Sequence, residues 1–431
     1  MLDHTQRLAE RFDHHDPHFS DEGVADEVYE ALRERCPVAH SDAHGGFWAI
    51  AGYPELFDVA NDDGHFMKRY GLSVPGMTDI STPDAVVAQN TRLPSNLDPP
   101  GYFKLRKVYN PAFAPGEAQK WETVASSLAR RLVDEVVERG ECDLVTDVFQ
   151  PFTGIFTVKL VGLDEADWRA FAEPVHESLH KPLDEDDGDD RTRHAYVPTD
   201  ADAVEVNNAT TGTAAAIMRA AEARRADPRD DFITHLVTAE IDGVPLTDME
   251  ILANASLVIA GGVDTTIGAM GGALLHLSRH PEDRDRLLAE PELMGTAVEE
   301  FLRVFAPVTA IARMASSDVE VAGQQIRRGD PVLLLYRSAN RDERVFDRPQ
   351  EVVLDRKPNR HLTFSAGIHR CPGSNFARME LRVMVEEVLR RLPDYEVRED
   401  GVRSQPDISI INSYASMPIT FTPGTRELAT R

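Results

Sequence analysis

The longest apolar stretch of the chain constrains its fold more than any other feature. Residues 251–277 read ILANASLVIAGGVDTTIGAMGGALLHL and carry a single charge, Asp264. A T-x-x-E capping pattern at 247–250 precedes the stretch, and Pro281 ends the helical pattern after it. These signals predict one helix over 248–279, roughly 48 Å long at about 1.5 Å per residue.

A transmembrane helix is the first alternative, because about 20 apolar residues span a bilayer. Asp264 at the centre of the stretch counts against it, at a cost of roughly 3 kcal/mol. The flanking sequences TDME and SRHPEDR also lack a one-sided excess of positive charge. We therefore expect a helix that crosses the interior of one large domain, which we take to be residues 1–431.

The centre of this helix, AGGVDTT, has two interpretations. LVIAGG does not begin a dinucleotide-binding turn, because the G-x-G-x-x-G spacing is absent. Gly261 and Gly262 weaken a helix, and Thr265 is able to bond a carbonyl one turn back and bend it. Either the helix crosses another with Asp264 satisfied by a partner, or a distorted helix borders a pocket where the acid and the alcohol supply protons.

A second informative stretch is FSAGIHRCPG at 364–373, which holds one of only three cysteines. An apolar stripe after it predicts a helix that starts with Pro372 and places Cys371 at its N-terminus, where the backbone favours a thiolate. The stripe comprises Ala377, Leu381, Met384, Val388 and Leu392. A zinc site lacks a second Cys/His pair at ligand spacing, and a nucleophile paired with His369 is disfavoured because residues two apart in a loop rarely face each other. A lone thiolate at a glycine-lined helix end suits haem iron better.

The stretch resembles the haem-binding loop of the cytochromes P450, F-x-x-G-x-H-x-C-x-G. Two further patterns agree: GGVDTT is similar to the family's oxygen-activation helix, and Glu300 with Arg303 gives E-x-x-R between the two. The resemblance covers most of the chain. It implies a mainly α fold with a smaller β portion, in which the long helix crosses over one haem b.

The resemblance also implies roles for individual residues. Cys371 would be the axial thiolate, while Asp264 and Thr265 would deliver protons during oxygen activation. Haem contacts are expected from Tyr102, Arg106, Arg313, Phe364, Gly367, His369 and Gly373, with propionate bonds from Tyr102, Arg106, Arg313 and His369. A buried ion network is expected from Glu300, Arg303 and Arg356. The distal pocket would be lined by Leu257, Ala260, Gly261, Val308, Thr309, Ile311 and Ile411, with further lining from regions 71–97 and 165–215.

The chain departs from the family pattern at four positions. Ser365 and Ala366 replace glycines of the cysteine loop, and Pro372 replaces the usual leucine. Tyr102 stands where many bacterial members have histidine. These departures leave the iron ligand and the proton-delivery pair in place.

Composition excludes several partners. The chain has 73 acidic and 46 basic residues, a net charge of −27, so we expect neither nucleic acid nor an anionic membrane to bind it. The acidic run at 183–190 is expected to be a solvated loop. The scattered cysteines and the polar N-terminal stretch predict a cytoplasmic protein without disulfides.

The predicted activity is monooxygenation of a largely apolar small molecule. No flavin or iron–sulfur segment fits in the chain, so NAD(P)H electrons are expected to arrive through a ferredoxin reductase and a ferredoxin. Arg106, Lys107 and Arg370 would form a local basic patch for that partner. Two rivals stay open, a peroxide-driven haem-thiolate enzyme and a haem sensor without turnover, and the Asp264–Thr265 pair argues against both.

Overall fold

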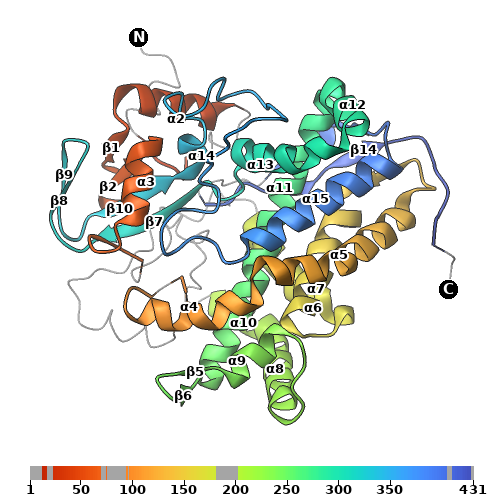
Figure 1. The fold of residues 1–431 in the computed structure, drawn as a ribbon, viewed down its shortest axis with the longest axis horizontal. Coiled ribbons are helices and arrows are strands. Elements are labelled where there is room, and N and C mark those ends of the chain that lie inside the picture. Colours follow the sequence, from red (N-terminus) through yellow and green to blue (C-terminus); the bar gives the residue numbers. More distant parts are fainter. Residues whose placement is uncertain are drawn as a thin grey trace.

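Helices dominate the computed structural model, and the strands of the main sheet lie together at one side of it (Figure 1). The structure describes residues 12–16, 23–68, 74, 94–95, 97–180, 202–404 and 410–428, with backbone only at 177–180 and 202–211. The helices are α2 (Val24–Arg35), α3 (Tyr53–Asn61), α4 (Gly101–Ala112), α5 (Pro115–Val136), α6 (Gln150–Val161), α7 (Trp168–His180), α8 (Asp202–Ala226), α9 (Phe232–Thr238), α10 (Asp248–Gly262), α11 (Asp264–Arg279), α12 (Pro281–Ala289), α13 (Met294–Phe305), α14 (Tyr336–Ala339) and α15 (Ser374–Arg391).

The predicted long central helix is present but interrupted. Thr247 caps α10 through the expected reciprocal bonds with Glu250. The helical path breaks at Val263, with φ −87° and ψ −81°, and resumes as α11. A Cβ at Gly262 would lie 2.8 Å from Oγ1 of Thr157, so this glycine permits close approach of α6. The expectation of one continuous helix was therefore wrong at one residue, and that residue lies inside AGGVDTT.

The main sheet has five strands in the order β1-β2-β10-β7-β3. Its strands are β1 (Val38–Ser41), β2 (Phe47–Ile50), β10 (Pro331–Leu335), β7 (Ala310–Ala315) and β3 (Phe66–Met67). All pairs are antiparallel except β2 with β10. β7 matters for the site because it carries Arg313 opposite Val332 of β10.

The smaller strands form one three-stranded sheet and three hairpin-like pairs. The sheet β11-β14-β4 comprises β11 (Glu396–Val397), β14 (Pro418–Thr420) and β4 (Glu141–Asp143). The pairs are β12 (Arg403–Ser404) with β13 (Tyr414–Ser416), β5 (Glu240–Ile241) with β6 (Val244–Pro245), and β8 (Val319–Val321) with β9 (Gln324–Ile326).

The helix after the cysteine starts later than expected. Its first residue is Ser374 and its N-cap is Gly373, so Pro372 lies in a turn before it. Four of the five residues of the predicted stripe are fully buried, from Leu381 to Leu392. α15 packs against α5, α11 and α13, which places the cysteine loop at one end of the helical core.

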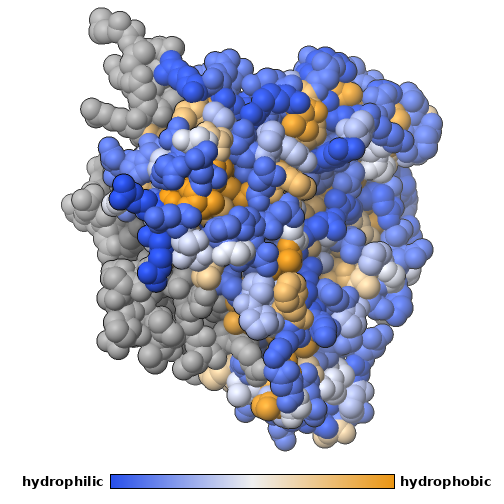
Figure 2. Space-filling model, turned by 60° about the vertical axis from the view of Figure 1, so that its left-hand side comes forward, coloured by the Kyte–Doolittle hydropathy of each residue, from blue (hydrophilic) through white to orange (hydrophobic). Residues whose placement is uncertain are grey.

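Two helical stretches are long and apolar enough to cross a membrane, namely 144–161 and 248–279. Most of each is buried inside the protein, as in core helices of water-soluble folds. One face of the molecule is mainly hydrophilic, with apolar residues in separate spots (Figure 2). The acidic run at 183–190 and most of region 71–97 lie outside the described residues.

Candidate haem-binding and oxygen-activation site

The cysteine loop is a tight turn held by its own backbone. The amide of Cys371 donates to the carbonyl of Phe364 at 2.9 Å, which closes the loop. Gly367 has φ +66°, and a Cβ there would lie 2.5 Å from the carbonyl oxygen of Ala60. The glycine is needed both for the left-handed backbone and for this approach to α3.

Ser365 shows why a glycine is common at its position. Its φ is 62°, in the left-handed region that side chains rarely adopt. Its hydroxyl accepts a hydrogen bond from Tyr336 at 2.9 Å, which ties the loop to α14. The serine therefore adds a bond at a position where its backbone is strained.

The sulfur of Cys371 experiences opposing influences. Cys371 is exposed, yet desolvation by the protein atoms near its sulfur raises the pKa of the thiol above its ordinary value, while a hydrogen bond from the backbone of Gly373 and the charges of Arg106 and Lys68 lower it. The helix end alone therefore does not secure the thiolate, contrary to the sequence-based argument. A metal ion at the sulfur would deprotonate it directly.

Cations gather around this cysteine. Arg313, on β7, and His369 are buried, and Arg106 of α4 lies close enough to His369 to affect its pKa. Burial and three neighbouring cations together lower the pKa of His369 to about 2. Lys68, which the sequence analysis missed, is the third of these cations; burial and Arg313 bring its pKa well below the ordinary value.

This cluster fits the carboxylates of a haem. Burying several like charges together is unfavourable unless anions compensate them. Nη2 of Arg313 is buried and has no hydrogen-bond partner among the described residues. Two propionates beside a cysteine would supply that charge and those acceptors, so the residues present suit haem as the family pattern implies.

Tyr102 behaves differently from the expectation. Its hydroxyl donates its single proton to the carbonyl of Ile368, and its ring lies 4.2 Å from that of His369. Because a phenol has one proton, the expected bond to a propionate is corrected: in this structure Tyr102 anchors the cysteine loop to α4.

The interruption between α10 and α11 carries the predicted acid and alcohol. Oγ1 of Thr265 donates to the carbonyl of Gly261 at 2.7 Å, the bond one turn back that the sequence predicted. Asp264 is fully buried, and its Oδ1 bonds Nδ1 of His176 at 2.7 Å. Ser413 donates to the backbone carbonyl of Asp264 at 3.1 Å.

His176 was not found by sequence reasoning. It lies in α7, 88 residues before its partner, and no local pattern marks it. It is itself 7% exposed, so its bond to Asp264 is shielded from water. The buried acid thus has a partner, as the first interpretation of AGGVDTT expects, and lies at a distorted helix, as the second expects; proton supply by Asp264 and Thr265 stays a prediction.

The predicted ion network is formed by the three expected residues. Arg303 makes two bonds of 2.8 Å to the carboxylate of Glu300, and both side chains are fully buried. Nε of Arg356 adds bonds of 2.9 and 3.0 Å to the same carboxylate. Arg303 also donates to three backbone carbonyls, at Asn340, Pro349 and Glu351, which fixes the chain that leads to the cysteine loop.

The expected pocket residues do not all border open space. Six of them are partly or fully accessible, namely Leu257, Ala260, Gly261, Val308, Ile311 and Ile411. A Cβ at Gly261 would meet no atom within 4 Å, in contrast to Gly262. Thr309 is fully buried and its amide bonds the carbonyl of Ile410, so its assignment to the lining is corrected. Because side chains alternate along extended backbone, Thr309 faces away from the side of Val308.

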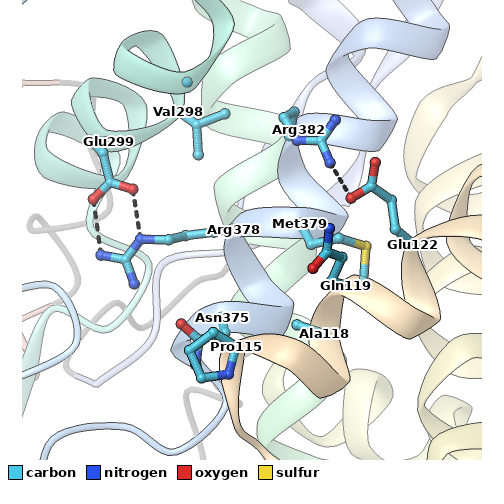
Figure 3. Close-up of a pocket in the computed structure, with 11 residues that line it drawn as sticks. Pro115, Ala118, Gln119, Glu122, Val298, Glu299, Asn375, Arg378, Met379 and Arg382 are labelled. Carbon is cyan, nitrogen blue, oxygen red and sulfur yellow. Dashed lines mark hydrogen bonds and ion pairs between the residues drawn. The ribbon is translucent and has the colours of Figure 1, made fainter.

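A hollow between α5, α13 and α15 lies apart from these residues (Figure 3). None of the predicted site residues lines it. Arg378 at its rim makes bonds of 2.6 and 2.9 Å to Glu299 and lies 4.5 Å over the ring of Phe364. The hollow is therefore linked to the site through Arg378, whose guanidinium packs on Phe364 at the start of the cysteine loop.

Comparisons with known proteins agree with this geometry. The family model described as "Cytochrome P450" matches residues 197–410. A "Steroid C26-monooxygenase" of Mycobacterium tuberculosis is 34% identical over 405 residues, which cover 92% of this chain and 93% of the relative. "Cytochrome P450 130" of the same species is 33% identical and covers 87% of this chain and 90% of the relative.

Solved structures share the fold. P450BioI, in complex with an acyl carrier protein that bears hexadec-9Z-enoic acid, superposes with a TM-score of 0.81 at 25% identity, covering 94% of this chain and all of that one. The Bacillus subtilis enzyme CYP109B1 gives a TM-score of 0.78 at 28% identity over 95% of this chain and all of that one. The mainly α fold with a smaller β portion is thereby confirmed, and the chain belongs to the cytochrome P450 family of haem monooxygenases.

Proposed function

We propose that the chain, acting as a single domain, is a cytoplasmic haem b monooxygenase that inserts one atom of dioxygen into a largely apolar small molecule. The observation that carries this proposal is the buried group of Lys68, Arg313 and His369, in which Lys68 lies close to both Arg313 and Cys371. When bound, the haem supplies the oxygen-activating chemistry, with the thiolate donating electron density.

The protein's own residues hold and orient the group. Cys371 would ligate the iron, and Arg106, Arg313 and Lys68 would neutralise the propionates. His369, neutral at a pKa of about 2, would contribute a hydrogen bond from its ring. Tyr102 holds the loop in place through Ile368. Gly261, with open space where a Cβ would lie, leaves α10 free of a side chain at the break.

Proton handling falls to the break between α10 and α11. The hydroxyl oxygen of Thr265 keeps a lone pair for a donor while its proton bonds Gly261. His176 bonds Oδ1 of Asp264 and thereby fixes the orientation of the carboxyl group next to Thr265. His176 is therefore a positioning residue that links α7 to proton delivery.

Aliphatic side chains favour an apolar substrate. Leu257, Val308, Ile311 and Ile411 are half-buried and carry no polar groups. Relatives named as a steroid C26-monooxygenase and a methyl-branched lipid omega-hydroxylase support a substrate of steroid or lipid character. We expect a steroid and a methyl-branched fatty acid to shift the Soret band on titration, and a small polar alcohol to leave it unchanged.

Electrons are proposed to come from NAD(P)H through a ferredoxin reductase and a ferredoxin. Lys107 and Arg370 are exposed and Arg106 is half-buried, as a basic docking patch near the cysteine requires. Reversing Lys107 to Glu should slow electron transfer from ferredoxin mainly at low salt, because such steering is screened by ions.

The test of the function combines spectroscopy with product analysis. The reduced carbonyl complex should show the long-wavelength Soret band of thiolate ligation, and Cys371→His should lose it. Thr265→Ala should bind substrate nearly as well as native protein but form less product per NAD(P)H, with more peroxide, whereas Thr265→Ser keeps the hydroxyl and should retain coupling. Haem binding without product from reduced ferredoxin would favour a sensor, and product from peroxide alone would favour a peroxide-driven enzyme.

A further inference from the structure

Three histidines meet at the edge of the main sheet, in a cluster that shares no residue with the haem site. His14 and His15 belong to the segment 12–16, and His44 belongs to the turn between β1 and β2. One ligand atom from each lies within 4.8 Å of the others. His14 and His15 are buried, and the side chain of His44 is only 16% exposed.

Two of the three rings bond an acceptor through Nε2. That nitrogen of His44 lies 2.8 Å from Oδ1 of Asp13, and that of His15 lies 2.8 Å from the carbonyl oxygen of Val74. Since both partners are acceptors, Nε2 carries the proton and Nδ1 carries the lone pair in each ring. Metal-binding histidines characteristically donate their second nitrogen to a carboxylate or a backbone carbonyl in this way.

The backbone that presents His44 is strained. Its φ is 52° and its ψ is 32°, in the left-handed region that glycine adopts most easily. The two residues that follow it in the turn are glycines, yet the left-handed conformation also falls on the histidine. A bulky side chain persists there only where its surroundings hold it. The bond to Asp13 supplies part of that hold and turns the ring towards the other two histidines.

The charges around the cluster suit a cation. Asp13 accepts hydrogen bonds from Nε2 of His44 at 2.8 Å and from the backbone amide of His15 at 2.9 Å, so a carboxyl group lies directly beside the three rings. A neutral imidazole nitrogen with a free lone pair is the form of histidine that binds metal. The edge contact between His14 and Phe47 explains why the ring of His14 is buried. It does not explain why the rings of all three histidines converge.

We propose that His14, His15 and His44 bind one divalent cation of the zinc class, with Asp13 orienting His44. Three histidines plus one further ligand is a common zinc set. A tetrahedral ion about 2.1 Å from each nitrogen needs nitrogens about 3.4 Å apart. The ligand atoms lie within 4.8 Å of one another, so the rings need to close by at most about 1.4 Å. The ion would clip the segment 12–16 to the β1–β2 turn.

Zinc binding tests the proposal independently of enzyme activity. Haem-loaded full-length protein, first dialysed against a chelator, is titrated with ZnCl₂ by calorimetry. The critical variant is His44→Asn, because asparagine tolerates the left-handed backbone and preserves the turn. The matched control is His40→Ala, which removes a half-exposed histidine from β1 of the same hairpin.

We expect one zinc per native chain and per His40→Ala chain, with at least tenfold weaker binding to His44→Asn. Asp13→Asn should weaken binding by about 10–100-fold, since it acts through the orientation of His44. Zinc should also raise the melting temperature of the native protein but not that of His44→Asn. Equal zinc affinity of native and His44→Asn protein, or no saturable native site, would overturn the proposal, and an intact thiolate Soret band in each variant excludes misfolding as the cause.

Discussion

Gly367→Ala should destabilise the protein by about 2–5 kcal/mol and displace the loop that carries Cys371. Alanine in a left-handed backbone costs about 1–2 kcal/mol, and φ at Gly367 is +66°. The new Cβ would also lie 2.5 Å from the carbonyl oxygen of Ala60 and 3.2 Å from Cα of Asn61. These are backbone atoms of α3, so the contact cannot be relieved by a rotamer change and adds about 1–3 kcal/mol of overpacking.

Urea unfolding of the haem-loaded protein measures this cost, and the carbonyl Soret band reports the fraction of chains that keep thiolate ligation. Gly116→Ala is the matched control, because a Cβ there meets no atom within 4 Å and the residue is helical. It should leave stability unchanged or raise it by up to about 1 kcal/mol. A loss below about 1 kcal/mol for Gly367→Ala, with a native Soret band, would refute the reasoning that α3 fixes the loop.

Three further predictions concern buried partners of the site. His176→Phe should lower the free energy of unfolding by about 1.5–3 kcal/mol and reduce the product formed per NAD(P)H, because Asp264 loses its hydrogen-bond donor. His176→Asn should recover part of both losses. An unchanged ratio of product to NAD(P)H in both variants would show that His176 has no role in proton handling. Tyr102→Phe should increase hydrogen exchange at the amide of Cys371 and speed haem transfer to an apo-acceptor, since the bond to Ile368 is lost; native rates for both would mean that ring packing alone holds the loop. Glu300→Gln should cost about 3–5 kcal/mol by leaving two buried arginines uncompensated. Burial would raise the pKa of Glu300, but hydrogen bonds and the charge of Arg303 lower it below 4.5, so its contribution to stability is complete above about pH 4.5 and declines at lower pH. The free energy of unfolding of Glu300→Gln, measured in urea, should therefore fall less with acid than that of the native protein. Equal acid dependence in the two proteins would contradict this.

Patterns within one element were readable from the sequence. The cap at Thr247, the buried stripe of α15 and the E-x-x-R pair each depend on residues three or four apart on one helix. The spacing of glycines around Cys371 likewise reflects the local turn. The break at Val263 was only partly foreseen, because AGGVDTT indicates distortion without saying whether the helix bends or stops.

Packing between elements decided the rest. His176 meets Asp264 across 88 residues. Lys68 joins the cation cluster from the residue directly after β3, the strand at the opposite edge of the main sheet from β1. Thr309 was assigned to the pocket by position along the chain, yet the approach of Ile410 places it in the interior.

The sequence by itself determined the chemical identity of the site: a cysteine in a glycine-lined loop, an acid–alcohol pair at a weakened helix, and a paired Glu300 and Arg303. Only the tertiary structure decided which partner each buried charged group has. It also decided that Tyr102 bonds the carbonyl of Ile368 and that three histidines from two segments converge. The physical reason is that local spacing fixes backbone conformation and the face of one element. The partner of a buried polar group depends instead on which distant elements pack against it, and a single sequence does not encode that as a local pattern.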